Sequence, residues 1–291
     1  MVKVILSKTR INYSVWRRLG WFKHGESDSH EYLIQVFDKH VSRANMSGSL
    51  RGKTILEIGP GDSIGTAVIA ASYGAKAILL DSGDFATTDI SFYIGLTNEL
   101  RGRGLHPPDL SNVTSLREIL DLCSSVYLTG GVTSYSSIES ETIDLIFSQA
   151  VLEHIDRLSF QDAMRECYRV LKPNGQASHQ IDLRDHLGGG LNNLRFSHRI
   201  WESRLFRKSG FYTNRLRRAE MLDCFTACGF SIVGQETRRW DTLPIGRSKL
   251  AAPFQRFDDA ELTISGFAVI MSRRKDEMSG MPQTNNKFLA K

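Results

Sequence analysis

A glycine-rich turn at the end of a short apolar run, TILEIGPGDSIG at residues 54–65, constrains the fold more than any other stretch. Gly59 and Gly61 tolerate positive φ and let a ligand approach the backbone closely. A helix that begins after such a turn presents free N–H groups to polar ligand atoms. The next apolar run ends in Asp81. In an open α/β sheet the end of this strand lies at the same crevice as the glycine turn, and a carboxylate there accepts the hydrogens of ribose hydroxyls. This order of elements predicts a site for a nucleotide-like cofactor.

Short apolar runs alternate with helical patterns along most of the chain. Such alternation predicts an α/β fold whose sheet is mostly parallel and covered by helices on both faces. We expect seven strands, at residues 54–58, 77–80, 126–128, 143–148, 176–183, 231–237 and 262–272. The sequence KPNG, residues 172–175, is expected to end the helix at 159–171 and to precede the fifth strand. Residues 184–217 fit no regular pattern, and we expect them to form an insertion after that strand.

The composition is typical of a globular protein without a membrane span. No apolar stretch approaches the roughly 18 residues that a transmembrane helix needs, and the N-terminus lacks the apolar core of a secretory signal. The cysteines show neither a CxxC pair nor zinc-ligand spacing, which favours free thiols at Cys123, Cys167, Cys224 and Cys228. Free thiols fit a reducing compartment, so we expect a cytoplasmic protein.

The net charge of +5 is distributed unevenly along the chain. Residues 199–218 are strongly basic and include aromatic side chains, and WRRLGWFK at residues 16–23 mixes the same residue types. Both segments fit either a solvated face or contact with an anionic ligand or membrane surface, so peripheral membrane contact stays an alternative. A basic composition alone is insufficient evidence for a nucleic-acid partner.

Glu57 precedes the first glycine of the turn and narrows the choice of cofactor. A carboxylate at this place would face the pyrophosphate of a dinucleotide, whereas it attracts a cationic or zwitterionic cofactor. The alternative is a structural one, in which Glu57 orders the turn by accepting backbone N–H groups.

Four segments, LEIGPGDSIG, AILLD, IDLIFSQAVLEHI and YRVLKPNGQASH, together resemble class I S-adenosylmethionine-dependent methyltransferases. The resemblance covers residues 50–183 well and the last two strands weakly. It implies a Rossmann-like sheet and S-adenosylmethionine as the cofactor. We accordingly divide the chain into an N-terminal helical cover (1–50), a methyltransferase domain (51–272) with an acceptor-site insertion (184–217), and a tail expected to be disordered (273–291).

The resemblance also implies which residues contact the cofactor. The first turn would surround its methionine part, Asp81 would bind its ribose, and the end of the fourth strand would line the methyl-transfer mouth. In the family, an acid at the position of Gly131 or Val132 often contacts the adenine, and a third glycine is usual at the position of Ser63. The implied contact residues are Glu57, Gly59, Pro60, Gly61, Asp81, Ser82, Gly131, Val132, Ser148, Gln149 and Ala150.

Asp182, Asp185 and His186 cluster after the fifth strand, at the edge where open α/β sheets bind ligands. Three interpretations compete for this cluster. His186 is a general base oriented by one carboxylate, or the three side chains hold a divalent metal, or they cap a helix and pair with nearby arginines. We expect these three residues to be catalytic, and we expect no metal.

The segment at 192–212 mixes hydrogen-bonding groups with aromatic rings, as carbohydrate sites do, and weakly resembles methyltransferases of bacterial surface-polysaccharide pathways. The residues expected to contact the substrate are His154, Asn193, Arg195 and Tyr212. The hypothesis is methylation of a hydroxyl on a small molecule, a sugar or a glycolipid; the alternative is a non-catalytic cofactor-binding or scaffold protein. No DPPY-like tetrapeptide follows the fourth strand, where the chain reads SQAV, so we expect no nucleic-acid partner.

Overall fold

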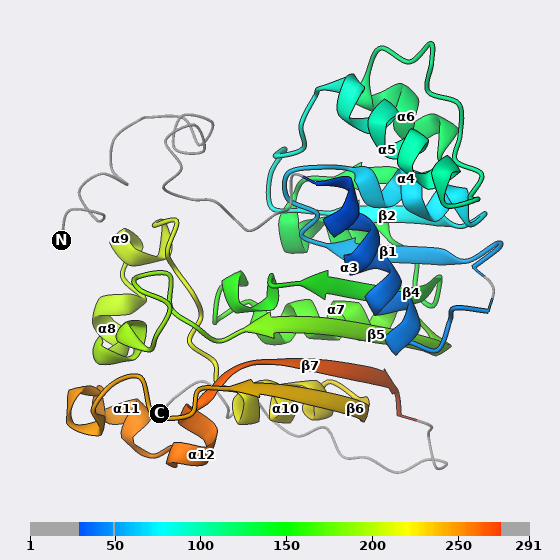
Figure 1. Cartoon of the computed structure of the whole chain (residues 1–291). Helices are drawn as coiled ribbons and strands as arrows, with labels where there is room; N and C mark the ends of the chain where they lie inside the picture. The colour runs from blue at the N-terminus through cyan, green and yellow to red at the C-terminus, as the bar shows by residue number, and fades with distance from the viewer. Residues whose placement is uncertain (1–28, 49, 275–291) are drawn as a thin grey trace.

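The computed structural model describes residues 29–48 and 50–274, and these residues contain a seven-stranded sheet (Figure 1). The strand order is β3-β2-β1-β4-β5-β7-β6; β1 to β5 are parallel, and β7 is antiparallel to both of its neighbours. The strands are β1 (Thr54–Ile58), β2 (Lys76–Leu80), β3 (Val126–Leu128), β4 (Ile143–Gln149), β5 (Leu171–Asp182), β6 (Phe230–Arg239) and β7 (Ile264–Arg273). The predicted Rossmann-like, mostly parallel sheet is thereby confirmed.

Helices cover both faces of the sheet because both faces of the central strands are apolar. Successive residues of a strand point to opposite faces, so on β1 Ile55 packs into one layer and Leu56 into the other. One layer contains α3 (His30–Arg43), α4 (Gly65–Ser72), α5 (Ile90–Gly102) and α6 (Leu116–Leu122). The opposite layer contains α7 (Phe160–Val170) and α10 (Arg218–Ala227).

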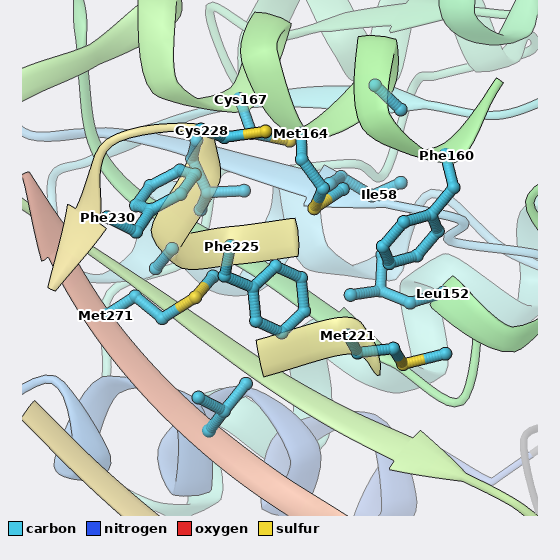
Figure 2. Close-up of a cluster of buried hydrophobic side chains, with 14 of the residues drawn as sticks. Ile58, Leu152, Phe160, Met164, Cys167, Met221, Phe225, Cys228, Phe230 and Met271 are labelled. Carbon is cyan, nitrogen blue, oxygen red and sulfur yellow. The ribbon is translucent and has the colours of Figure 1, made fainter. Parts of the chain in front are cut away.

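The layer of α7 and α10 is rich in sulfur (Figure 2). Met164 and Cys167 on α7 lie near Cys228, which caps α10, and Met271 of β7 lies on the other side of Phe225. Thioethers are unbranched and polarisable, and they fill irregular gaps between aromatic rings. All four cysteines are free thiols, as the sequence predicted.

Helix α3 packs against β4 and β5 on the first face. The Ser29 hydroxyl accepts a hydrogen bond from the Tyr32 backbone N–H at 3.1 Å and caps the helix. This helix is the described part of the predicted N-terminal cover, whose residues 1–28 lie outside the described residues. The predicted tail also lies almost entirely outside them, and Arg273, its first residue, ends β7.

Strand β5 begins earlier than predicted. We expected KPNG to separate the helix from the strand, but the chain already pairs with β4 at Leu171. The register shifts between Ile143 and Leu145 of β4, and this irregularity accommodates the four residues on the β5 side. The helix itself ends at Val170, as the turn residues indicated.

Two segments project beyond the arrowheads of β4 and β5 in Figure 1. The first is the predicted insertion after β5, with η3 (Asn192–Arg195), α8 (His198–Trp201) and α9 (Arg204–Arg207). The second, between β6 and β7, was not predicted and contains η4 (Arg247–Lys249), α11 (Ala252–Gln255) and α12 (Asp259–Leu262). Short 3-10 turns also follow β3 and β4, namely η1 (Gly131–Ser137) and η2 (Leu152–His154). No helix among the described residues is long and apolar enough to cross a membrane.

Candidate cofactor and acceptor site

The turn after β1 has a conformation that only glycine fits well. Gly59 has a φ of 71° and Gly61 a φ of 64°, both in the left-handed region. A Cβ on Gly59 would lie 2.5 Å from a methyl group of Val151, so a side chain is excluded there by contact as well. The Gly59 N–H donates to the Leu80 carbonyl at 2.8 Å and ties the turn to the end of β2.

Ser63, which stands where a third glycine is usual, has a local role in the structure. The Ser63 hydroxyl accepts the Gly65 N–H at 3.2 Å, so the serine orders the start of α4. Gly65 is packed against α3, and a Cβ there would lie 2.7 Å from the Leu33 side chain. Gly65 therefore permits the close approach of α3 to the turn.

Asp81 joins the turn to the end of β2. Its carboxylate accepts the Gly61 N–H at 3.0 Å and the Ser82 N–H at 2.7 Å. Burial raises the pKa of Asp81, although the two backbone hydrogen bonds oppose this. Gly131, with a φ of 59°, donates its N–H to the Asp81 carbonyl at 2.7 Å. The structure thus brings together the turn, Asp81, Ser82 and the start of η1, and their role as a cofactor site stays a prediction.

Glu57 places a buried carboxyl beneath this turn. It is the fourth residue of β1, and only 8% of its surface is exposed. Burial raises its pKa to about 7; a hydrogen bond with Thr66 lowers it, and the charge of Asp81 raises it further. Because a cation nearby favours the ionised form, this carboxyl is suited to a positively charged ligand group.

The end of β4 differs from the expectation in one respect. The Ser148 side chain is fully buried, and its hydroxyl is 2.8 Å from Nδ1 of His179, so it points to β5 rather than into a mouth. Gln149 is partly buried, and its Oε1 accepts a hydrogen bond from His40 Nε2 at 3.3 Å. Ala150 is exposed and has a φ of 55°, an uncommon conformation for a residue with a side chain.

Two residues of α3 reach this place, and sequence reasoning did not assign them to the site. Burial raises the pKa of Tyr32, whose hydroxyl bonds with Gln149 and whose pKa is also affected by the charge of Glu57. His40 is buried, which lowers its pKa to about 3, and its neutral ring stacks on Phe147 at 4.9 Å. The helical spacing of apolar residues at 34, 37 and 41 was the available signal for α3, but it does not give the direction of its polar side chains.

His154 lies in η2, directly after the β4 end, with its Nδ1 2.9 Å from the Tyr212 carbonyl oxygen. A carbonyl only accepts, so Nδ1 carries the proton and Nε2 holds the lone pair of the neutral ring. The His186 ring stacks on His154 with centroids 5.0 Å apart and an interplanar angle of 25°. The structure therefore brings His154 and Tyr212, which the sequence analysis named as substrate contacts, together with His186, which it named as catalytic.

The carboxylates expected to orient His186 are engaged elsewhere. Asp182 forms a bidentate ion pair with Arg184, with a shortest distance of 2.7 Å. Asp185 accepts backbone N–H groups of Leu187 and Asn192 and so orders its own loop. These contacts favour the structural interpretation for both carboxylates. Among the described residues, no group of three metal-ligating side chains is placed to hold a metal ion.

The remaining predicted substrate residues differ in exposure. Arg195 is exposed, whereas Asn193 is buried and donates its amide to the Thr213 hydroxyl at 3.0 Å. Tyr212 is almost fully buried, and its hydroxyl donates to Glu202 at 2.8 Å. Tyr212 therefore contacts the site through its backbone carbonyl oxygen, which accepts the hydrogen bond from His154 Nδ1 and so orients the His154 ring.

Glu153 is a buried group that the sequence reasoning did not assign to a role. One carboxylate oxygen accepts the Asp182 N–H at 3.2 Å, and burial raises the pKa of Glu153 to about 8. A cavity of about 10 Å³, the space of roughly one water molecule, lies between β5 and the insertion. Four residues that line it have a buried polar atom without a partner among the described residues: Glu153, Asn193, Arg215 and Arg217.

Comparison with known protein families gives a match over part of the chain. A protein-family profile described as a methyltransferase domain matches residues 109–178. The matched segment runs from before β3 into β5 and includes η2, where His154 lies. Over this segment the chain is therefore similar to methyltransferase domains. No curated protein matches the chain.

Several solved structures are similar in outline. An S-adenosylmethionine-dependent methyltransferase from Methanosarcina mazei is 17% identical, with a TM-score of 0.46, over 78% of this chain and 94% of that one. One from Mesorhizobium loti is 14% identical, with a TM-score of 0.43, over 79% and 94%. One from Archaeoglobus fulgidus is 10% identical, with a TM-score of 0.45, over 84% and 95%.

Proposed function

We propose that the protein transfers the methyl group of S-adenosylmethionine to a hydroxyl group of a small molecule, with His154 as the general base. The observation that carries the proposal is the hydrogen bond between His154 Nδ1 and the Tyr212 carbonyl. It assigns the proton to Nδ1, so that Nε2 is the basic nitrogen of the neutral ring, and η2 places His154 directly after β4, at the ligand edge of the sheet. An oxygen acceptor must lose its proton during transfer, which requires a base of this kind.

The cofactor is proposed to lie across the ends of β1 and β2. Its methionine part carries positive charge, which Glu57 favours, and its ribose is proposed to bond with Asp81 and Ser82. Gly131 and Val132 are proposed to border the adenine, and Gln149, held by Tyr32 and His40, to border the transferred methyl group. The buried position of both carboxyls, at 8% exposure each, supports this arrangement because a buried acid needs a nearby positive charge or a proton.

His186 is proposed to assist His154 rather than to act with Asp182 and Asp185. Stacking at 5.0 Å fixes the orientation of the His154 ring, while the two carboxylates hold the loop that carries His186. Asn193 and Arg195 remain proposed acceptor contacts from η3. A sugar or glycolipid acceptor, as in polysaccharide biosynthesis, and a cytoplasmic location remain part of the proposal.

The proposal is tested by separating binding from transfer. His154→Gln should keep S-adenosylmethionine affinity, measured by calorimetry, and lower kcat by about 100-fold or more, measured as S-adenosylhomocysteine formed with a panel of sugars and phenols. Asp81→Asn should weaken cofactor binding instead. An active His154→Gln variant, with unchanged kcat, would refute the assignment of the base.

The non-catalytic alternative predicts a different pattern. A scaffold protein of this fold would bind S-adenosylmethionine but would form no S-adenosylhomocysteine with any acceptor in a complete cell extract. Its cofactor affinity would still depend on Asp81.

A further inference from the structure

The insertion after β5 has an outer face with both apolar and basic side chains. Ile200 on α8 is 49% exposed and Leu205 on α9 is 38% exposed, although both are large aliphatic residues. Leu158, 61% exposed, belongs to the neighbouring loop after η2. An ion pair between Arg207 and Asp156 joins α9 to that loop.

The inner side of the same helices explains why these residues face outward. Trp201 is fully buried against Phe211 and Tyr212, and its indole N–H donates to the Thr213 carbonyl at 2.7 Å. Phe206 packs against the Trp201 ring at 5.3 Å. Because these rings fix the inner side of α8 and α9, the adjacent residues along each helix point to solvent. The outward exposure of Ile200 and Leu205 is therefore built into the fold of the insertion.

The charged side chains of residues 195–208 are also divided between an outer and an inner side of the insertion. Between residues 195 and 208 there are five cationic side chains, all exposed: Arg195, Arg199, Arg204, Arg207 and Lys208. Glu202 is the single acid in that range of the sequence, and it turns inward to accept the Tyr212 hydroxyl and to pair with Arg215. The outer face therefore carries positive charge around aliphatic side chains, with no acid of its own segment beside them.

We propose that this outer face of α8 and α9, made of Arg199, Ile200, Arg204, Leu205 and Lys208, docks onto an anionic lipid bilayer. A bilayer surface supplies both things that the face needs, namely negative headgroups for the cations and an apolar layer for the aliphatic side chains. Two short helices cannot lie deep in the acyl region, so binding is peripheral and reversible. The ends of β4 and β5 lie on the same side of the molecule as this face (Figure 1), so docking turns the ligand edge of the sheet toward the membrane.

The charge contribution sets the size of the expected effect. Each lysine or arginine near an anionic surface raises the partition coefficient about fivefold, so removing three of them lowers it about 100-fold. This contribution is screened by salt, with a Debye length of about 10 Å at 0.1 M. The aliphatic contribution is not screened, and removing two half-buried aliphatic side chains lowers the partition coefficient about tenfold.

Vesicle sedimentation with the full chain tests the proposal without a substrate. Vesicles of phosphatidylcholine with about one third phosphatidylserine should bind the protein, and pure phosphatidylcholine vesicles should bind it far more weakly. The face variant R199Q/R204Q/K208Q should lose about 100-fold in the partition coefficient. The control variant R51Q/K76Q/R117Q removes the same charge from exposed positions elsewhere and should bind as the unmodified chain does.

A second variant separates the apolar contribution from the charge. I200S/L205S should lose about tenfold in the partition coefficient, and this loss should be the same at about 0.1 M and 0.5 M salt. Equal losses in the face and control variants would refute the proposal, because the attraction would then follow net charge alone. Unchanged binding by the face variant would also overturn it, as would binding to duplex DNA or single-stranded RNA that exceeds binding to anionic vesicles. Circular dichroism of each variant confirms that it is folded.

Discussion

Replacing Glu57 by glutamine should stabilise the cofactor-free protein. Burial raises the pKa of Glu57 to about 7 from its ordinary value of 4.5. A carboxyl with a raised pKa binds more protons in the folded than in the unfolded state between these two pH values, so the free energy of unfolding falls as pH rises through this window. At 1.36 kcal/mol for each pKa unit, the difference between 4.5 and 7 corresponds to about 3 kcal/mol above pH 7.

Urea unfolding at a series of pH values measures this directly. At about pH 8 the free energy of unfolding of Glu57→Gln should exceed that of the unmodified protein by up to about 3 kcal/mol, and at about pH 4 the two should agree. Asp84→Asn removes the same charge from an exposed position near the site and should change the free energy of unfolding by less than about 0.5 kcal/mol. A Glu57→Gln protein that is less stable at pH 8 would refute the reasoning, because the carboxylate would then be stabilised by partners that outweigh its burial.

The same carboxyl should make cofactor binding depend on pH. With a pKa of about 7, the ionised fraction of Glu57 rises from about 3% at pH 5.5 to about 50% at pH 7, so affinity for S-adenosylmethionine should rise about 15-fold. Calorimetry should show this rise in the unmodified protein and a flat, weaker profile in Glu57→Gln. A parallel rise in both proteins would assign the pH dependence to another group.

Three further substitutions test the packing around the site. Gly59→Ala should lower the free energy of unfolding by about 2 kcal/mol or more, because Gly59 has a φ of 71° and an added Cβ would contact Val151. Adding Val151→Ala should restore only part of the lost free energy, as measured by urea unfolding. Glu153→Gln should leave the free energy of unfolding at about pH 4 unchanged and raise it by about 2–4 kcal/mol at pH 9. The reason is that the pKa of Glu153 is about 8, so the unmodified protein loses stability as pH rises from 4.5 to 8. A difference that does not depend on pH would refute this. Arg217→Met should lower the unfolding free energy by about 3 kcal/mol, because the carbonyls of Glu261, Leu262 and Ile264 lose their donor, and a neutral result would show that water replaces it.

The sheet was predictable because its signal is local. Residues 126–128 were predicted as a strand with the bounds that β3 has, and the turn at Gly59 and Gly61 required conformations that few residues other than glycine adopt. The position of Asp81 at the same sheet edge as that turn also followed from strand order, whereas the hydrogen bond from the Gly61 N–H to its carboxylate was not predicted. These features depend on backbone geometry, which a run of apolar residues and glycines specifies directly.

The side-chain partners at the ligand edge were not predictable in the same way. Asp182 and Asp185 were expected to face His186, yet each meets groups within ten residues of itself in the chain. The four-residue helices between β6 and β7 have no periodic signal, because a helix so short is stabilised by its tertiary contacts. Tyr32 was predicted only as part of the N-terminal cover. The sequence of a helix that packs on a sheet indicates which of its residues are buried, but it does not indicate which side chain reaches a site.

The sulfur-rich layer between α7, α10 and β7 gives the protein an internal chemical reporter. The thioethers of Met164, Met221 and Met271 are fully buried, so peroxide reaches them only when this layer separates from the sheet. Mass spectrometry of methionine sulfoxide would therefore record the opening of one half of the molecule separately from the other. Once formed, a polar sulfoxide among Phe160, Phe225 and Phe230 disfavours reclosing, so oxidation converts a transient opening into a lasting loss of that half of the core.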